Sequence, residues 1–369
     1  MSTLKSTLKR VWEKLPLAPE IEWYLIQGQS MPGRKRLVRL KGFLADWLHQ
    51  ADKAEVNTTI PSKNILLFSM LPIWMKHSGV LASAFYGLGQ DVTLAYLPHE
   101  DWFTEQSTYQ LKLRNLQLGS SFSPVEGRFR AVSWYQAGKR TVLPKDLAAR
   151  IVDVAGRDYQ YTHQVESVDR QTDFYQWRKQ SNLATARAAF DYLSQNRPDV
   201  VIVPNGLILN FGAVFEVAQY LGIPTVTYEY GEQKDRIWLA QNQPVMFQDT
   251  SAMWQACKDT PFTKDQQDRI EELYASRKQA GLWQNFSRQW QDVPTQGGEA
   301  ARKALALDER PIVLLAANVI GDSLTLGRQV FSESMTEWIE RTLAFFRDKD
   351  QVQFVLRIHP GERYTDGPS

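Results

Sequence analysis

Hydrophobic and polar residues follow two patterns along the chain, one typical of buried strands and one of amphipathic helices. From Asn64 to Met70 the apolar residues are nearly continuous, as in a strand buried on both faces. After a short predicted loop with Pro72 and His77, apolar residues recur at helical spacing over 80–88, and 91–97 reads as a second strand. The order strand, loop, helix, strand predicts the building block of a doubly wound parallel sheet.

The same order returns twice further along the chain. We predict a helix at 164–197, a strand at 199–203, a helix at 214–221 and a strand at 224–228. A polar helix follows. Beyond it we predict a strand at 311–317, a loop at 318–326, a helix at 331–346 and a strand at 351–358. The stretch 107–151 is less regular, and we expect short strands mixed with connecting helices there.

The length of 369 residues is too great for one ordinary domain and suits two. We expect an α/β protein with two Rossmann-like doubly wound parallel-sheet domains, the second incomplete. Two strands and one helix cannot bury both faces of a parallel sheet, which predicts that the rest of the second domain is missing. The alternative is that these strands extend the first domain's sheet. We predict a basic helical segment at 1–55 and a first domain at 56–280. A linker at 281–298 and the start of a second domain at 299–369 follow.

The balance of basic and acidic residues indicates which partners the protein is expected to bind. Lys and Arg number 43 against 41 Asp and Glu, and this near-balance argues against nucleic acid as a partner. Residues 1–50 are locally basic, with nine Lys and Arg against four Asp and Glu. Such a segment could rest on an anionic membrane surface, or it could be a helix that packs on the domain with a solvated basic face. With no secretory signal in the sequence, we expect a cytoplasmic protein that could also lie on the inner face of the membrane.

Two polar loops follow the last two predicted strands. A glycine-containing loop that enters a helix offers backbone N–H groups to an anion, and Arg and His side chains neutralise phosphate oxygens. Because parallel strands end at the same edge of a sheet, we expect Asp322 and His359 side by side in an anion-receptive pocket. The alternative is that His359 forms hydrogen bonds within the protein at the end of the strand, while the neighbouring Arg and Glu side chains face solvent. The predicted nucleotide-sugar-binding residues are Asn318, Gly321, Asp322, Ser323, Arg357, His359, Pro360, Glu362 and Arg363.

These two loops carry a resemblance to a known family. The stretch Ala317-Asn-Val-Ile-Gly-Asp-Ser323, a helix, and then Val355-Leu-Arg-Ile-His-Pro360 resemble the capsule polysaccharide biosynthesis family, which includes β-Kdo transferases. The resemblance covers 311–363 and implies a GT-B glycosyltransferase, with the acceptor mainly on the first domain and the nucleotide-sugar on the second. It also implies that His359 contacts the nucleotide phosphate, while Asp322 and Ser323 line the donor crevice.

The chain also departs from the family's pattern. Asn318 stands where the family has Gln or a similar residue, and Arg357 where Lys is common, so the donor sugar can differ. A later Ser/Thr-rich loop and an acidic residue of the family have no counterpart before Ser369, so this chain could be an inactive fragment.

The first half supplies candidates for the acceptor side. His77, near the end of the first strand, could deprotonate an acceptor hydroxyl, or it could simply face solvent. Glu229 and Glu232 follow a later strand and are predicted as alternative catalytic bases, or as a surface acidic loop. The predicted acceptor-binding residues are Asn205, Tyr230 and Arg236.

The sequence therefore predicts a glycosyltransferase that moves a sugar from a nucleotide-sugar donor to a surface polysaccharide or glycolipid acceptor. A CMP-linked acidic sugar is one candidate donor. Metal-ligand spacing such as HExxH is lacking, and the single Cys257 cannot form a Cys-based zinc cluster, so we expect a metal-independent enzyme without a cofactor. The alternatives are a nucleotide-sugar epimerase of the same architecture and a non-catalytic scaffold in polysaccharide assembly.

Overall fold

The computed structural model describes residues 11–26, 34–56, 59, 61–231, 233, 236–279, 281 and 297–364, without the side chains of 26, 34–38, 363 and 364. The chain forms two compact units. The first comprises Met1–Gly156, Arg170–Tyr228 and Gln241–Pro244. The second comprises Arg157–Asp169, Glu229–Ala240 and Val245–Ser369.

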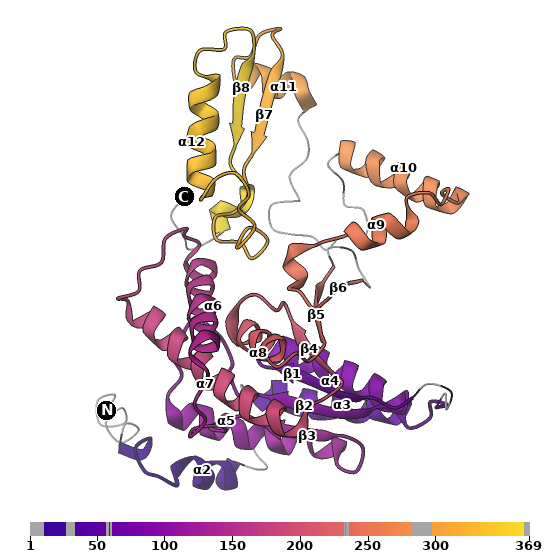
Figure 1. Cartoon of the computed structure of the whole chain (residues 1–369), viewed down its shortest axis with the longest axis vertical. Coiled ribbons are helices and arrows are strands. Elements are labelled where there is room, and N and C mark those ends of the chain that lie inside the picture. The colour runs from indigo at the N-terminus through magenta and orange to yellow at the C-terminus, as the bar shows by residue number, and fades with distance from the viewer. Residues whose placement is uncertain are drawn as a thin grey trace. The chain divides into compact units, whose positions relative to one another are not determined.

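The first unit is built on a mostly parallel sheet (Figure 1). The neighbouring pairs from β3 to β5 are all parallel, with Leu67 of β1 opposite Leu94 of β2 and Ile202 of β4. The strand order reverses at β1, as in Rossmann-like folds, and this confirms the α/β class predicted from the sequence. Within the described residues the order is β3 (Arg130–Ser133), β2 (Asp91–Tyr96), β1 (Asn64–Ser69), β4 (Val200–Pro204), β5 (Thr225–Tyr230) and β6 (Ile237–Gln241), of which the end of β5 and most of β6 belong to the second unit.

Helices cover both faces of this sheet, which explains its continuous apolar runs. Leu66, Leu67 and Phe68 of β1 are all buried although successive side chains point to opposite faces. The helices of the first unit are α2 (Ala18–Ile26), α3 (Arg34–Ala51), α4 (Pro72–Gly87), α5 (Thr108–Ser121), α6 (Lys145–His163, which continues into the second unit), α7 (Asp173–Asn196) and α8 (Leu209–Tyr220), with the short η1 (Ser123–Val125).

The basic N-terminal segment contains a helix that packs on the first unit. Leu40, Leu44 and Leu48 of α3 are buried in the core, and α3 lies against α4. A Cβ on Gly79 of α4 would lie only 2.6 Å from Leu44 Cδ2, so the two helices approach closely there. The apolar face of α3 is therefore used inside the protein, and contact of residues 1–50 with a membrane stays a prediction.

Two predicted boundaries in the first unit are wrong. Residues after β1 were expected to form a loop, but α4 begins at Pro72 and holds His77 within the helix. Proline suits the first helical turn, where its missing N–H would have no helical partner. The helix predicted from 164 begins only at Asp173, where the Thr172 side chain accepts a hydrogen bond from the Tyr175 N–H and caps the helix.

The second unit contains a separate parallel pair of strands. β7 (Ile312–Ala316) and β8 (Gln353–Arg357) pair in parallel and are joined by α12 (Met335–Phe346), with Phe346 stacked on Phe354 at 4.9 Å. The alternative that these strands extend the first sheet is wrong, because among the described residues they form a sheet of their own. The predicted linker falls largely in 282–296, outside the described residues. The other elements of this unit are η2 (Val245–Phe247), α9 (Ser251–Cys257), α10 (Lys264–Lys278), α11 (Gly297–Ala304) and η3 (Pro360–Tyr364).

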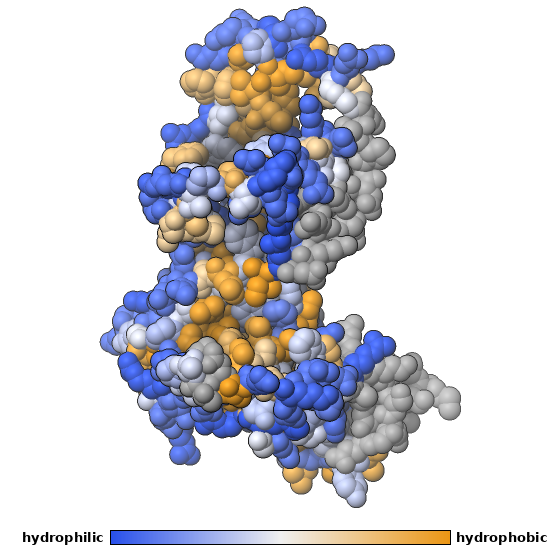
Figure 2. Space-filling view, turned by 90° about the vertical axis from the view of Figure 1, so that its right-hand side faces the viewer, coloured by the Kyte–Doolittle hydropathy of each residue, from blue (hydrophilic) through white to orange (hydrophobic). Residues whose placement is uncertain are grey.

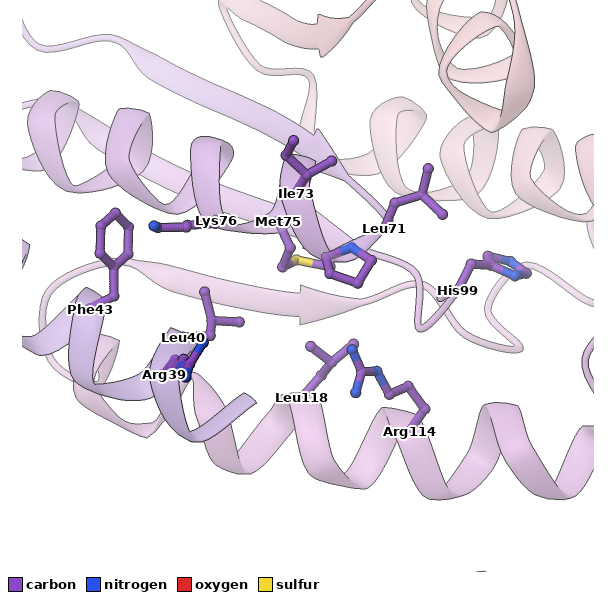
Figure 3. A pocket seen from close by; sticks show the side chains of 11 residues that line it. Arg39, Leu40, Phe43, Leu71, Ile73, Met75, Lys76, His99, Arg114 and Leu118 are labelled. Carbon is purple, nitrogen blue, oxygen red and sulfur yellow. The ribbon is translucent and has the colours of Figure 1, made fainter. Parts of the chain in front are cut away.

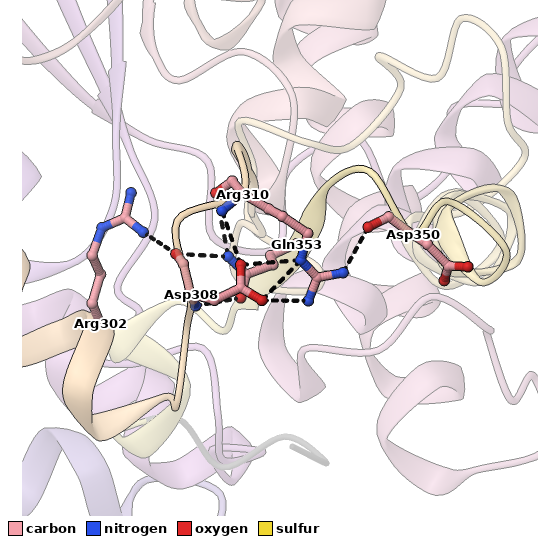
Figure 4. Close-up of polar contacts among 5 residues, drawn as sticks. All are labelled: Arg302, Asp308, Arg310, Asp350 and Gln353. Carbon is pink, nitrogen blue, oxygen red and sulfur yellow. Dashed lines mark hydrogen bonds and ion pairs between the residues drawn. The ribbon is translucent and has the colours of Figure 1, made fainter.

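A polar network holds the amino ends of β7 and β8 together (Figure 4). The Gln353 side chain accepts from the Asp308 N–H at 2.9 Å and donates to the Asp308 and Arg310 carbonyls. The Arg310 guanidinium binds both Asp308 carboxylate oxygens and holds the pKa of that carboxyl below its usual range. Arg310 also donates to the Asp350 carbonyl at 2.7 Å. These bonds fix the register of the pair at one end, and they thereby place the loops at the other end.

The β7–β8 pair exposes apolar side chains on its surface. Ile312 and Leu314 of β7 and Ile358 after β8 are all exposed, and Figure 2 shows hydrophobic residues gathered on the part of the chain that holds these strands. Among the described helices, none combines the length and the apolar character needed to cross a membrane.

Candidate functional site

The two polar loops of the second unit leave the same edge of the β7–β8 sheet. Ala316 lies opposite Arg357 in the parallel register, and the Ala317 N–H donates to the Arg357 carbonyl at 3.0 Å. The parallel pairing of these two strands was predicted from the sequence and is confirmed, whereas the side-by-side placement of Asp322 and His359 in one pocket stays a prediction.

Glu362 ties the two loops together. Its Oε1 accepts a hydrogen bond from the Ile320 N–H at 3.0 Å. His359 uses Nδ1 to accept from the Gly361 N–H at 2.9 Å, so Nε2 is the nitrogen that carries the proton in the neutral ring. Pro360 begins the short helix η3, and Arg357 is exposed at the end of β8. The side chain of Arg363 lies outside the described residues.

The loop after β7 uses most of its predicted site residues in its own structure. Asp322 Oδ1 accepts from the Leu324 N–H at 2.8 Å, and Asn318 Oδ1 accepts from the Val319 N–H at 2.9 Å. Ser323 is buried and its hydroxyl lies 3.3 Å from Met246 Sδ. Gly321 has φ +71°, and a Cβ there would lie 2.3 Å from the Gln160 carbonyl oxygen. Close packing on α6 therefore explains this glycine without a ligand.

A cavity of about 400 Å³ lies beside this loop, within the usual range of about 300–1,000 Å³ for ligand sites. Its walls come from the loop after β7, the start of α12 and the end of α6 with the loop that follows. Amide and aromatic side chains stand out among the lining residues, which include Gln160, Asn318, Arg328, Gln329, Phe331 and Trp338. Neither Arg357 nor His359 is among the described residues that line it.

Glu166 occupies the amino end of α12 at one wall of this cavity. Its carboxylate accepts from the Met335 N–H, from the Thr336 N–H at 3.2 Å and from the Thr336 hydroxyl at 2.5 Å. Helix amino ends favour negative charge because their N–H groups lack helical partners. The donors that an anionic ligand would use at α12 are thus bound by a carboxylate of the same unit.

Tyr161 on α6 brings together two residues that the sequence placed in different roles. Burial raises its pKa to about 12, helped by the nearby charges of Asp322, Glu229 and Asp158. Glu229 was a predicted base and Asp322 a predicted donor-site residue, so these two carboxylates lie near one tyrosine. Sequence reasoning missed Tyr161, because a single tyrosine in a helix carries no motif. In the described parts of the chain, no three His, Cys, Asp or Glu side chains form a metal-binding group.

The remaining predicted acceptor-side residues of the second unit lie around the end of β5. Glu229 Oε1 accepts from the Tyr230 N–H at 3.0 Å, and burial together with Glu229 raises the pKa of Tyr230 to about 12. Arg236 is exposed, and its carbonyl accepts from the Gly231 N–H at 2.9 Å. Glu232 lies outside the described residues.

His77 and Asn205 belong to the first unit and have structural contacts there. The His77 ring stacks on Tyr228 with a centroid distance of 5.2 Å, and burial lowers its pKa. Asn205 has φ +58°, and its side-chain oxygen accepts from the Leu207 and Ile208 N–H groups at the turn before α8. Neither residue is placed with Glu229, Tyr230 or Arg236 in one described site, because those three lie in the second unit.

Comparison with known proteins adds no family to this geometry. No protein-family model matches the chain, and no curated protein matches it. The resemblance to the capsule polysaccharide biosynthesis family therefore rests on the two loop motifs alone.

A half-buried histidine in the first unit predicts a loss of stability in acid. Burial, with the nearby charge of Arg178, lowers the pKa of His99 to about 4, whereas the unfolded side chain titrates near ~6.5. The unfolded chain therefore binds the extra proton first, so His99 should lower the free energy of unfolding as pH falls from 6.5 to 4, by up to about 3 kcal/mol. Urea unfolding at pH 7 and pH 4.5 should show a smaller drop for His99→Gln than for wild type. His49→Gln, which removes an exposed histidine of α3, should leave the drop unchanged; equal drops in all three proteins would contradict the assignment.

Proposed function

We propose that the protein is a glycosyltransferase that uses a nucleotide-sugar donor, and that the donor binds in the cavity beside the loop after β7. The observation that carries this proposal is the chemistry of the cavity at the carboxyl edge of a parallel β-α-β unit, where such folds bind ligands. Amide groups match the hydroxyls of a sugar or nucleoside, and aromatic side chains give apolar surface for a ring.

The donor phosphates would lie toward Arg328 and the amino end of α12. Arg328 lines the cavity, and its Nη1 makes long hydrogen bonds of 3.4 and 3.3 Å to the Met246 and Leu324 carbonyls. Phosphate can replace these contacts with charge-assisted bonds, which are stronger. Thr336 and the N–H groups at the amino end of α12 would donate hydrogen bonds to phosphate oxygens, which would take the place of the Glu166 carboxylate. The mechanism would be positioning of donor and acceptor and stabilisation of the departing phosphate.

The acceptor hydroxyl would be activated by a carboxylate of the same unit. Among the predicted bases that the structure describes, Glu229 is the one in the unit that holds the cavity, where it lies with Asp322 near Tyr161. A base of this kind takes the proton as the bond to the sugar forms. His77, the other described candidate base, belongs to the first unit, and its role as a base stays a prediction from the sequence.

Nucleotide binding tests this proposal directly. Titration calorimetry with CMP, UDP and GDP should show one of the three binding with one site per chain. Arg328→Gln and Asn318→Ala should each weaken that binding about tenfold, the effect of losing about 1.4 kcal/mol. Arg347→Gln is the matched control, because Arg347 is exposed just beyond α12 and does not line the cavity. Failure of all three nucleotides to bind, or unchanged affinity in both lining variants, would overturn the proposal.

One observation favours a second candidate, a non-catalytic scaffold in polysaccharide assembly. Glu166 and Glu362 already bind the amides that an anion would use at this edge. A scaffold would bind no nucleotide, whereas a transferase should bind one more tightly in the Glu166→Gln variant, which removes the competing charge. Incubation with nucleotide-sugar and no acceptor would separate a transferase from an epimerase, because only the epimerase changes the sugar.

A further inference from the structure

The first unit contains a second cavity with a different chemistry. It has a volume of about 450 Å³ and lies where α3, α4 and α5 meet, at the carboxyl ends of β1 and β2 (Figure 3). This size falls in the usual range of about 300–1,000 Å³ for ligand sites. Nothing in the proposed donor site involves this cavity.

Most of the wall is apolar. The apolar lining comes from three helices and the end of β1, and it includes Leu40, Phe43, Leu71, Ile73, Met75 and Leu118. Leu71, which stands between β1 and α4, has φ +65°, a backbone conformation that costs a non-glycine residue about 1–3 kcal/mol. Aliphatic side chains around a space of this size favour a ligand that buries hydrocarbon.

The charged groups of the wall are all cationic. Arg39, Lys76 and Arg114 come from α3, α4 and α5, and among the described lining residues no Asp or Glu occurs. The Lys76 ammonium lies 4.3 Å from the centre of the Phe43 ring, at the edge of the cavity where Figure 3 shows both side chains. Arg114 is buried and pairs with Glu100 at 3.0 Å, so its charge is partly balanced from outside the wall. The excess positive charge therefore rests mainly on Arg39 and Lys76.

We infer that this cavity binds an anionic amphiphile, a molecule with one alkyl chain and a phosphate or carboxylate head. The chain would lie against the apolar wall, and the head would meet Arg39 and Lys76. Sugars and nucleosides fit poorly, because among the described lining residues no carboxylate and no side-chain amide occurs, which leaves the His99 ring as the acceptor for their hydroxyls. A phosphate head would indicate a lipid phosphate, and a carboxylate head would indicate a fatty acid.

Binding of simple amphiphiles to the full chain tests this inference. Decyl phosphate and decanoate, each below its micellar concentration, should bind with one site per chain by titration calorimetry. Decanol should bind at least tenfold more weakly, and decyltrimethylammonium more weakly still. Shortening decyl phosphate to octyl phosphate should weaken binding about tenfold, since each buried methylene contributes about three- to fourfold. The tighter of the two anions identifies the source, whereas no binding of either, or equal binding of all four compounds, would overturn the inference.

Ile73 offers a variant that keeps the fold intact. It lines the cavity yet is 62% exposed, so replacing it should leave the thermal unfolding temperature unchanged. Ile73→Glu places a negative charge at the wall and should weaken decyl phosphate at least tenfold, while Ile73→Lys should bind it as well as wild type or better. Lys41→Gln is the control on α3, because Lys41 is exposed and does not line the cavity. Equal losses in Ile73→Glu and Ile73→Lys, or no loss in either, would contradict the cationic head site.

Discussion

Replacing Gly321 by alanine should destabilise the second unit by at least about 3 kcal/mol. The new Cβ would lie 2.3 Å from the Gln160 carbonyl oxygen and 2.9 Å from Gln164 Cα, and both are backbone atoms that cannot rotate away. The positive φ of +71° adds a conformational cost of about 1–2 kcal/mol for a residue with a side chain. Chemical unfolding, followed by the loss of helical circular dichroism, measures the effect.

Gly327 provides a matched control in the same loop. It has nearly the same backbone angle, φ +70°, but a Cβ there would meet only Phe247 at an ordinary 3.8 Å. Gly327→Ala should therefore cost only the conformational part, about 1–2 kcal/mol. The difference between the two variants isolates the close approach of the loop to α6. Equal destabilisation would show that the loop can move away from α6, and the packing explanation of Gly321 would then be wrong.

Replacing Asn210 by alanine should destabilise the first unit by about 2–4 kcal/mol. Asn210 is 0% exposed, and its side-chain oxygen accepts from the buried Arg178 guanidinium at 3.1 Å. Its amide also donates to the Thr185 hydroxyl at 2.7 Å and the Ser181 hydroxyl at 3.1 Å, joining α7 to α8. Removing an acceptor from a buried cation costs its desolvation as well as the bond, about 1.5–3 kcal/mol for the bond alone. Equilibrium urea unfolding at pH 7 measures the loss.

Two further variants separate the polar contact from lost volume. Asn210→Asp keeps an acceptor for the Arg178 guanidinium, so it should lose much less stability than Asn210→Ala. Asn196→Ala removes an exposed asparagine of α7 that donates to the Tyr192 carbonyl, and it should change stability by less than about 0.5 kcal/mol. A loss in Asn210→Asp as large as in Asn210→Ala would assign the effect to packing and contradict the network.

The sequence alone was a good guide wherever a local pattern determines the element. Strands such as Asn64–Ser69 and Ile312–Ala316 appear where continuous apolar runs predict them, because burial on both faces requires such runs. Boundaries were less certain where a single residue decides them. Pro72 was interpreted as part of a loop, although proline is equally suited to the first turn of a helix.

The candidate site shows a different limit. The chain order predicted that the loops holding Asp322 and His359 would leave one sheet edge, since that follows from parallel pairing. It did not predict that Glu362 and Glu166 would bind the nearby backbone amides, or that Tyr161 would lie near Glu229 and Asp322. These contacts join residues that are up to 170 positions apart, and no local pattern encodes such pairs.

What the sequence by itself determined is therefore the α/β class, the order of the elements and the edge at which the last two polar loops emerge. Only the tertiary structure decided that Gly321 packs on α6 and that a cationic, apolar cavity opens among α3, α4 and α5. The physical reason is that periodicity reports whether a side chain faces the core, whereas the partner it meets there depends on how distant segments pack.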